Sequence, residues 1–474
     1  MCRFPQVSYM LLCTLLSTTV FNSYSDEQAP EKPRVCIVGT GYVGLPTAGI
    51  LSSFGNHVAC VDVLSEKIAQ INNGRLPIFE PGLEQLLQEP IKSGRLTFST
   101  DVLSHMQRAS IIVIAVGTPM SKNGAADLRA IDAVVEDLAK AITSYKIICI
   151  KSTVPVGTCA HVRDALIAKG INKDLFDIVS NPEFLREGTA VQDSLNPDRI
   201  IIGGNPRATT IIKSLYQPLI DKGSAYLITS LETSELIKYA SNAMLATRIT
   251  FINEMARLCD KVGANVLDVA AGMGMDKRIG TAFLVPGPGF GGSCFPKDTK
   301  ALAYIMKNKK IGATLINAIY RSNVAHKKAI LKQIDKLIGD FTDKKVALLG
   351  LAFKANTDDI RDSFAIDAIA YLLAHNAHVS AYDPQGMDNM RTLFPQVSYG
   401  PTLEAAVQGA DLIVIITEWN EFKTLNVANL AQACRTKRLL DLRNIIDRAT
   451  AEQNGFTYIG MGVCPVKKSA KMIH

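Results

Sequence analysis

The pattern of apolar and polar positions in the first half of the chain predicts a parallel sheet. From Arg34 an apolar run leads into a glycine-rich turn, a stretch of small residues at helical spacing, and a second apolar run, 57–61, that is followed by Asp62. Strand, turn, helix and strand in this order form a βαβ unit. Apolar runs at 111–116 and 147–150, separated by helical stretches, continue the alternation expected of a doubly wound parallel sheet.

A weaker copy of this pattern lies near the C-terminal end. The apolar run 346–349 meets Gly350, a helical stretch follows, and the run 378–382 is followed by Asp383. The run 412–416 then repeats the third run of the first half. The copy keeps only the first glycine of the turn, so we expect it to hold the nucleotide part of another ligand rather than a dinucleotide.

Residues between the two halves, from Leu231 to about His326, are rich in Ala, Met and Leu at helical spacing, which predicts a helical connector. We also expect this connector to mediate association into a homodimer or a higher homo-oligomer. The predicted fold is therefore α/β, with two Rossmann-like doubly wound parallel-sheet domains joined by a central helical region. The expected boundaries are an N-terminal extension at 1–33, a first Rossmann domain at 34–230, the central region at 231–330 and a second Rossmann-like domain at 340–474.

The composition supports a folded chain and argues against one class of partner. Of the 474 residues, 47% are apolar and 20% are charged, which is enough for the cores of roughly two or three domains. The formal net charge of +7 is scattered, and lysine pairs such as Lys309 and Lys310 are not interleaved with aromatic residues, so nucleic acid is not an expected partner. The excess of cations suits a doubly negative phosphorylated ligand and a solvated surface equally well.

The turn after the first predicted strand has the spacing of a dinucleotide-binding site. Gly39 permits the tight turn, Gly41 lets the backbone approach a pyrophosphate, and Gly44 lets the helix pack against the strand. Asp62 ends the next strand, where its carboxylate can accept hydrogen bonds from the adenosine ribose and repels a 2′-phosphate. The sequence therefore predicts NAD rather than NADP, against the alternative of a glycine turn that binds nothing.

Flexible backbone precedes one cysteine of the chain, Cys294. The segment 286–292 contains only Pro, Gly and one Phe, and Lys297 and Asp298 follow the cysteine. Glycines let the backbone approach a ligand and leave a thiol accessible, while a nearby cation favours the thiolate. We interpret Cys294 as a nucleophile; the alternative is an inert cysteine in a tight loop.

A long helix is predicted over 232–257, and Lys238 and Asn242 lie four residues apart on one face of it. Taken by themselves, both residues could face solvent, which is the usual position of Lys. Apolar neighbours such as Leu236 and Met244 favour a buried position instead.

Two further segments follow apolar strands, at the sheet edge where open α/β proteins bind ligands. Glu183 and Glu187 lie after one strand and Thr153 lies after another. Ordinary helix entries are the alternative interpretation. His375 and His378 have no Cys, Asp or third His at ligand spacing, so no metal site is predicted.

Five segments resemble, in the right order, the UDP-glucose 6-dehydrogenases of the UDP-glucose/GDP-mannose dehydrogenase family. They are the glycine turn at Gly39, then 181–185, 235–242, 290–298 and 353–363, and the resemblance covers nearly everything after Arg34. The resemblance implies a twofold NAD-dependent oxidation of the C6 alcohol of UDP-glucose to a carboxylate, through a thiohemiacetal and a thioester on cysteine. In such proteins the second Rossmann-like half holds UDP.

The resemblance also implies catalytic roles. Cys294 is the nucleophile, Lys238 stabilises the developing oxyanion or shuttles protons for it, and Asn242 shares that oxygen. Asp298 sets the protonation of Lys238 and of the active-site water.

Glu183 is implied as the residue that activates water against the thioester, with Thr153 holding that water. The implied cofactor contacts are Gly39, Gly41, Tyr42, Val43, Gly44, Asp62, Lys67, Thr118, Thr153, Glu187 and Arg361. The implied substrate contacts are Glu183, Phe184, Leu185, Lys238, Asn242, Arg278, Phe290, Gly291, Lys354 and Arg443.

Two alternatives to this activity stay open. GDP-mannose 6-dehydrogenases keep a closely similar Gly-Gly-Ser-Cys segment, whereas Ser293 and Phe295 beside the cysteine argue against enzymes of UDP-N-acetylhexosamines. A non-catalytic nucleotide-sugar or NAD-binding regulator is the other alternative, and it predicts loss of the catalytic residues, which are all present here.

The cysteines and the N-terminus point to different compartments. The ten cysteines form no CxxC pair, and a free catalytic thiol with a need for NAD predicts the reducing cytoplasm. However, Arg3 precedes an apolar run at 7–21, and 23–25 passes for a signal-peptide cleavage site, so export is the alternative. The run is too short and too polar for a transmembrane helix, and no membrane partner is expected.

Overall fold

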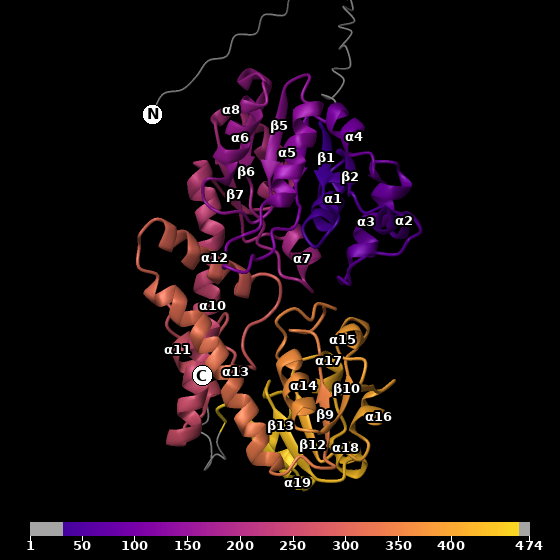
Figure 1. The fold of residues 1–474 in the computed structure, drawn as a ribbon, viewed down its shortest axis with the longest axis vertical. Coiled ribbons are helices and arrows are strands. Elements are labelled where there is room, and N and C mark those ends of the chain that lie inside the picture. Colours follow the sequence, from indigo (N-terminus) through magenta and orange to yellow (C-terminus); the bar gives the residue numbers. More distant parts are fainter. Residues whose placement is uncertain (1–31, 464–474) are drawn as a thin grey trace, which may run out of the picture. The chain divides into compact units, whose positions relative to one another are not determined.

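The first half of the chain contains an eight-stranded sheet in the computed structural model, which describes residues 32–463 (Figure 1). The strand order is β3-β2-β1-β4-β5-β6-β7-β8, and the pairs are parallel except β6 with β7. The strands are β1 (Arg34–Val38), β2 (His57–Val61), β3 (Leu96–Ser99), β4 (Ile111–Ile114), β5 (Lys146–Ile150), β6 (Phe176–Ser180), β7 (Arg199–Gly204) and β8 (Ala225–Thr229). The predicted N-terminal extension, with its signal-like segment, lies outside the described residues.

Helices cover both faces of this sheet. They are α1 (Gly44–Ser53), α2 (Ser65–Asn72), α3 (Leu83–Lys92), α4 (Val102–Arg108), α5 (Arg129–Ala141), α6 (Thr158–Ala168), α7 (Ala190–Leu195), α8 (Pro206–Leu215) and α9 (Gln217–Ile220), with a 3₁₀ turn at Lys173–Leu175. Val35 and Ile37 of β1 pack in one core with α1, α3 and α8. Cys36 and Val38 pack in a second core with α4, α5 and α6. Burial on both faces explains why the strands are continuous apolar runs, and the predicted doubly wound fold is confirmed.

The second half contains a six-stranded sheet that is parallel throughout, in the order β11-β10-β9-β12-β13-β14. Its strands are β9 (Lys345–Leu349), β10 (His378–Tyr382), β11 (Ser398–Tyr399), β12 (Leu412–Ile415), β13 (Arg438–Asp441) and β14 (Thr457–Gly460). Its helices are α14 (Phe364–Ala374), α15 (Met387–Leu393), α16 (Leu403–Val407), α17 (Asn420–Lys423), α18 (Val427–Ala433) and α19 (Arg448–Gln453). The sheet places β9, β10 and β12 in the same relation as β1, β2 and β4, so the predicted internal copy is confirmed.

The glycine turn of the second half differs from the first in one decisive contact. Gly350 and Gly39 both have positive φ, 97° and 109°. The amides of Leu351 and Ala352 after Gly350 donate to the carboxylate of Asp383 at 2.6 and 3.0 Å. Thr40, the counterpart of Leu351, likewise donates to Asp62 at 3.1 Å. The contact that distinguishes the second half is therefore that of Ala352, whose amide occupies the position that approaches the pyrophosphate of a dinucleotide in the first half.

Four helices form the central region, which Figure 1 shows with α10 and α13 in contact. They are α10 (Leu231–Val262), α11 (Val266–Gly274), α12 (Phe295–Asn308) and α13 (Thr314–Ile338). The helix predicted over 232–257 is confirmed as part of α10. α13 continues beyond the expected boundary at 330 and leads directly to β9.

On α10, the buried face contains polar residues and the exposed face contains apolar ones. Lys238 and Asn242 are buried, with 3% and 5% of their surface exposed, whereas Leu236 and Met244 are 45% and 63% exposed. The predicted burial of the two polar residues is confirmed. Of the five apolar neighbours that suggested it, Tyr239 and Ala243 are buried with them, whereas Leu236, Ala240 and Met244 lie on the exposed face. What buries Lys238 and Asn242 is the loop after β6 and the start of α12, both remote in sequence.

Candidate active site

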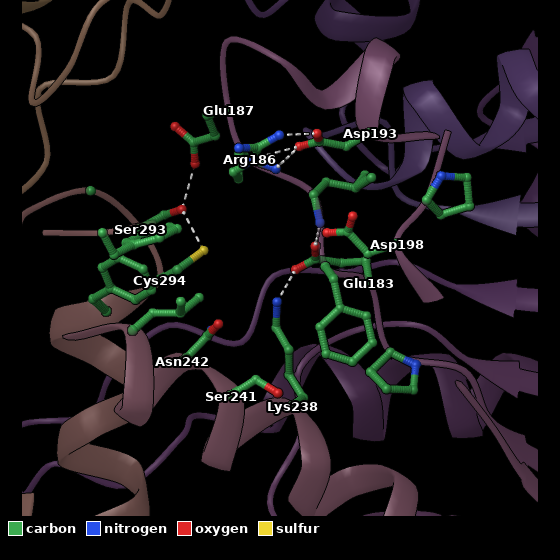
Figure 2. Close-up of a pocket in the computed structure, with 18 of the residues that line it drawn as sticks. Glu183, Arg186, Glu187, Asp193, Asp198, Lys238, Ser241, Asn242, Ser293 and Cys294 are labelled. Carbon is green, nitrogen blue, oxygen red and sulfur yellow. Dashed lines mark hydrogen bonds and ion pairs between the residues drawn. The ribbon is translucent and has the colours of Figure 1, made fainter. Parts of the chain in front are cut away.

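Residues from three parts of the chain line one cavity of about 740 Å³. They come from the loop between β6 and β7, from the first half of α10 with the loop before α12, and from loops of the second half. Figure 2 shows Glu183, Lys238, Asn242, Ser293 and Cys294 around this space. Of the predicted site residues, the cavity wall contains Glu183, Phe184, Leu185, Glu187, Lys238, Asn242, Phe290, Gly291, Cys294, Lys354 and Arg443.

The glycine turn of the first half has the geometry that a dinucleotide needs. A side chain at Gly44 would lie 1.9 Å from the carbonyl oxygen of Gly39. The helix can therefore pack this closely against the turn only because residue 44 is glycine. A side chain at Gly41 would meet no atom within 4 Å, which leaves the backbone open to a ligand. Asp62 accepts from the Thr40 amide and hydroxyl at 3.1 and 2.7 Å and lies 3.1 Å from Lys67. These residues fit NAD, with Asp62 oriented at the ribose edge.

Glu183 and Lys238 form an ion pair inside the cavity wall. The ammonium donates to the carboxylate at 2.9 Å, and the other oxygen of Glu183 accepts from the Leu185 amide at 2.6 Å. Burial alone would raise the pKa of Glu183, but the neighbouring ammonium outweighs burial and holds that pKa below its usual value. The carboxylate in turn holds the pKa of Lys238 above its usual value despite burial. Both groups are therefore charged at neutral pH.

Asn242 connects the cavity to a buried acid. Its amide nitrogen donates to Asp298 at 2.6 Å, and Lys297 binds the other oxygen of that carboxylate at 2.5 Å. Asp298 itself is completely buried on the first turn of α12. It therefore acts behind the cavity wall, by orienting the Asn242 amide, rather than in it.

Cys294 caps the N-terminus of α12 and faces the cavity. Among the seven cysteines of the described residues, five are buried, and Cys294 and Cys434 are partly exposed. Burial raises the pKa of the Cys294 thiol to about 11, and the charge of Lys238 opposes this rise. The ligand-free site thus keeps the thiol protonated, and Lys297, which the sequence suggested as an activating cation, is engaged by Asp298.

A serine links Cys294 to a second carboxylate. The hydroxyl of Ser293 donates to Glu187 at 2.5 Å and lies 3.4 Å from the sulfur of Cys294 (Figure 2). Burial and the nearby charge of Asp359 raise the pKa of Glu187 to about 8, and the Arg361 guanidinium at 3.6 Å opposes the rise. Glu187 is therefore largely protonated at neutral pH in the ligand-free protein.

The glycines before Cys294 let the loop pack against the protein itself. A side chain at Gly291 would lie 2.5 Å from the carbonyl oxygen of Asp362, and one at Gly292 would lie 2.7 Å from the ring of Phe353. Gly287 is held through its amide by Asn253 at 2.9 Å. Gly291 and Gly292 thus approach the second half and Gly289 approaches Asn323 of α13, while the close approach to a ligand that the sequence indicated stays a prediction.

Other predicted residues lie outside the cavity wall. Thr118 donates to the carbonyl oxygen of Thr153 at 2.7 Å, which joins two loops at the sheet edge. Tyr42 donates to Asp358 at 2.6 Å, and Arg361 is held by Asp359 at 2.7 Å. The side chain of Arg278 is 89% exposed and paired with Asp276, so this structure does not bring it to the cavity.

Several cavity residues were missed by the sequence analysis. Lys151 is buried behind Glu183, within 3.2 Å of Asn181, and Arg199 lies 3.8 Å from the ring centre of Phe184. A lysine that ends the apolar run 147–150 was a usable signal for a buried cation. Nothing in the sequence around Arg199 marks it.

Two kinds of feature are absent from residues 32–463. No group of three or more His, Cys, Asp or Glu side chains is arranged to hold a metal ion there. None of the helices described in that range is long and apolar enough to cross a membrane.

Comparison with known proteins identifies similar chains along nearly the whole length. Models of the UDP-glucose/GDP-mannose dehydrogenase family match at 33–220 (NAD binding domain), 232–325 (central domain) and 347–448 (UDP binding domain). UDP-glucose 6-dehydrogenases of Rickettsia prowazekii and Rhizobium meliloti are 42% and 43% identical, each over 90% of this chain and 99% of the relative. The structure of a UDP-glucose dehydrogenase from Pyrobaculum islandicum superposes with a TM-score of 0.85 at 33% identity, covering 92% of this chain and 99% of that one.

Proposed function

The chain belongs to the UDP-glucose/GDP-mannose dehydrogenase family, and on that premise we propose that it oxidises UDP-glucose to UDP-glucuronate with NAD. The overall reaction consumes two NAD and one water for each sugar and yields two NADH. The observation that carries the proposal is one cavity wall that combines a partly exposed cysteine with a buried ammonium and a buried carboxylate.

The proposed chemistry divides a four-electron oxidation into two hydride losses from C6, the first from the free alcohol to give an aldehyde and the second from a sugar bound to the sulfur of Cys294. NAD supplies the hydride acceptor for both oxidations when it is bound. The thiolate of Cys294 adds to the C6 aldehyde, which gives a thiohemiacetal, and loss of the second hydride leaves a thioester. Water then attacks the thioester and gives a proton to Glu183, the C–S bond breaks, the carboxylate product is released and the sulfur of Cys294 stays on the protein.

Lys238 and Asn242 stabilise the oxygen of C6 in this scheme. The ammonium of Lys238 is held charged by Glu183, so it supplies a fixed positive charge to a developing oxyanion rather than a base. Asn242 donates one N–H of its side-chain amide to Asp298, which orients it, and the second N–H of the same nitrogen is the donor proposed for the C6 oxygen. Glu183 is ionised and is therefore the group that can accept a proton from the attacking water.

The second half contributes cations for the diphosphate of the substrate. Lys354 and Arg443 line the cavity, and Arg443 is positioned by Glu418 at 3.0 Å and by the carbonyl oxygen of Ile416 at 2.7 Å. Arg278 remains a proposed contact, which requires a rearrangement from its exposed position.

The stoichiometry of reduced cofactor tests this proposal. With limiting UDP-glucose, we expect two NADH per sugar, and Cys294→Ala should form no acid. Cys434→Ala, at the other partly exposed cysteine, is the matched control and should keep its activity. Turnover with GDP-mannose but not with UDP-glucose would refute the substrate assignment, and wild-type rates in Cys294→Ala would refute covalent catalysis.

Copies of the chain are proposed to associate through α10. Its exposed face carries Met244, Phe251 and Leu258 at seven-residue spacing, with 63%, 42% and 51% exposure. Light scattering should report a homodimer for the wild type and a monomer for the double variant Phe251→Glu/Leu258→Glu. Ile167→Glu, which charges an exposed residue of α6, should leave the mass unchanged. A wild-type monomer would contradict the proposal.

We place the enzyme in the cytoplasm, because NAD supply and a free thiol at Cys294 suit a reducing compartment. Mass spectrometry of the native N-terminus tests this placement. Loss of the first 25 residues or so would favour export instead.

A further inference from the structure

A second cavity, of about 980 Å³, lies outside the candidate active site. The hairpin loop before α5 and the facing surfaces of α12 and α13 enclose it. Its wall, called here the basic cavity, includes five cationic residues and two tyrosines: Lys122, Lys300, Lys307, Lys310, Arg321, Tyr304 and Tyr320. None of its lining residues is acidic, although the chain as a whole has 51 Lys and Arg against 44 Asp and Glu.

The cations of the basic cavity are not neutralised by the protein. Within residues 32–463, no carboxylate lies within the 4.0 Å ion-pair distance of any of these five side chains. Lys300 lies over the ring of Tyr320, 4.0 Å from its centre, so this ammonium is held at the wall by an aromatic face. A concave cluster of cations without neutralising carboxylates attracts anions. Binding of an anion reduces the electrostatic repulsion among these cations.

The backbone around the basic cavity is defined. Met120 and Ala126 form an antiparallel bridge. Between them, the Gly124 amide donates to the carbonyl oxygen of Ser121 at 2.9 Å. The turn at Gly124 packs against Lys300, since a side chain at this glycine would lie 3.7 Å from the Lys300 β-carbon. The loop thus forms a fixed wall that positions Lys122 opposite the helices.

We propose that the basic cavity binds a compact ligand with several adjacent phosphates, either an inorganic oligophosphate or a nucleoside triphosphate. Ammonium and guanidinium groups recognise phosphate oxygens through charge-assisted hydrogen bonds, and five of them match a ligand of several negative charges. Tyr304 and Tyr320 offer aromatic surface that a base can use, and Asn123 and Asn317 add neutral hydrogen-bonding groups. A volume of about 980 Å³ admits either ligand.

Binding in the basic cavity bears on the thiol through one helix. α12 begins directly after Cys294, and Thr299, Lys300, Tyr304 and Lys307 on the same helix line the basic cavity. A ligand there would restrain the helix that carries the nucleophile at its N-terminus. This site does not depend on the proposed oxidation, because binding is measured without turnover.

Isothermal titration calorimetry on the full chain tests the site. UDP-glucose and NADH are first added to saturation, so that the anionic subsites of the active-site cavity are filled, and sodium tripolyphosphate is then titrated. We expect one further binding event per chain, and an affinity that falls by about tenfold or more in Lys307→Gln/Lys310→Gln, because each charge-assisted contact contributes on the order of one factor of ten. Lys328→Gln/Lys332→Gln removes two exposed lysines of α13 outside the basic cavity and should bind like the wild type.

Parallel titrations with ATP and with tripolyphosphate distinguish a nucleoside triphosphate from an inorganic oligophosphate as the ligand. ATP that binds more tightly than tripolyphosphate identifies a nucleotide site, and equal affinities identify an oligophosphate site; either outcome supports the proposal. Absence of binding at millimolar concentration, or an affinity unchanged in Lys307→Gln/Lys310→Gln, would overturn it. Failure of the oxidation assay, by contrast, would leave this titration unaffected.

Discussion

The ammonium of Lys238 lies 2.9 Å from the carboxylate of Glu183, and the two side chains are only 3% and 6% exposed. Each charge is therefore compensated almost entirely by the other. Any substitution that removes one partner leaves an unpaired charge in the wall of the cavity.

Replacing Lys238 by Met should damage activity and stability together. We expect kcat to fall by about 100-fold or more through loss of the oxyanion partner, and the free energy of unfolding to fall by about 3–5 kcal/mol because Glu183 stays buried without its cation. NADH formation and denaturant unfolding measure the two effects. Lys332→Met, at an exposed lysine of α13, is the control and should match the wild type. A stable variant with unchanged kcat would contradict the oxyanion role.

Alkylation of Cys294 should be slow at neutral pH. Burial raises the pKa of this thiol to about 11. In the ligand-free protein the labelling rate should therefore increase about tenfold for each unit by which the pH is raised, up to about pH 11. Mass spectrometry after brief iodoacetamide treatment measures it, with Cys294→Ala to identify the labelled site. Lys238→Met should slow labelling further, because the ammonium favours the thiolate. A rate that does not change between about pH 7 and pH 9 would show a thiol that is already ionised.

Glu187 should make the ligand-free protein less stable as the pH rises. Its pKa is raised to about 8 in the folded protein, so the folded state binds more protons than the unfolded state between the ordinary carboxyl pKa and about 8. The stability from this group is complete at acid pH and is lost as the pH rises through about 8. Glu187→Gln mimics the protonated form, so its melting temperature should exceed the wild type increasingly from about pH 5 to about pH 8, and by a constant amount above that.

Glu183→Gln is the contrasting variant for that experiment. The pKa of Glu183 is held low by Lys238, so its contribution to stability is present above the ordinary carboxyl pKa. Glu183→Gln should therefore be less stable than the wild type throughout the same pH range. Parallel curves for the wild type and Glu187→Gln would mean that Glu187 is ionised when buried.

The carboxylate of Asp62 should decide between the two nicotinamide dinucleotides. In Asp62→Ala we expect kcat/KM for NAD to fall by about tenfold or more, through loss of a charged hydrogen-bond acceptor, while kcat/KM for NADP rises because the repulsion of a 2′-phosphate is gone. Steady-state kinetics with both coenzymes measure the ratio. Asp132→Ala changes an exposed carboxylate of α5 and serves as control. An unchanged ratio would mean that Asp62 does not contact the ribose.

The sequence predicted the central strands of both sheets, such as β1, β2, β4 and β5, and the glycine turn after β1, because local patterns determine them; edge strands such as β3 and β8 were not predicted. Runs such as 111–116 are apolar on both faces of a covered sheet, and Gly39 and Gly44 are required by contacts that no side chain could enter. Those features depend on neighbours close in sequence or on a repeated pattern. They can therefore be recognised without the tertiary structure.

The pairings inside the site could not be predicted in this way. Glu183 and Lys238 are 55 residues apart, and Ser293 and Glu187 are 106 apart, so no spacing rule joins them. The burial of Lys238 depends on which side of α10 the rest of the chain covers. Apolar Met244 lies on the uncovered side, which polarity alone does not reveal.

Because of the carboxylate of Asp383, the backbone amides at the two glycine turns differ in how many of them are hydrogen-bonded within the protein. The second half carries its own anion at the turn after β9, bound to Leu351 and Ala352. In the first half, the amides of Gly41 and its neighbours up to Val43 have no partner among the hydrogen bonds of residues 32–463. The amides of the first turn are therefore available to a bound coenzyme, which would complete the hydrogen bonding of that turn. Coenzyme that binds these amides in the folded chain but not in the unfolded chain raises the free energy of unfolding, so the stability of the first half should increase with coenzyme concentration.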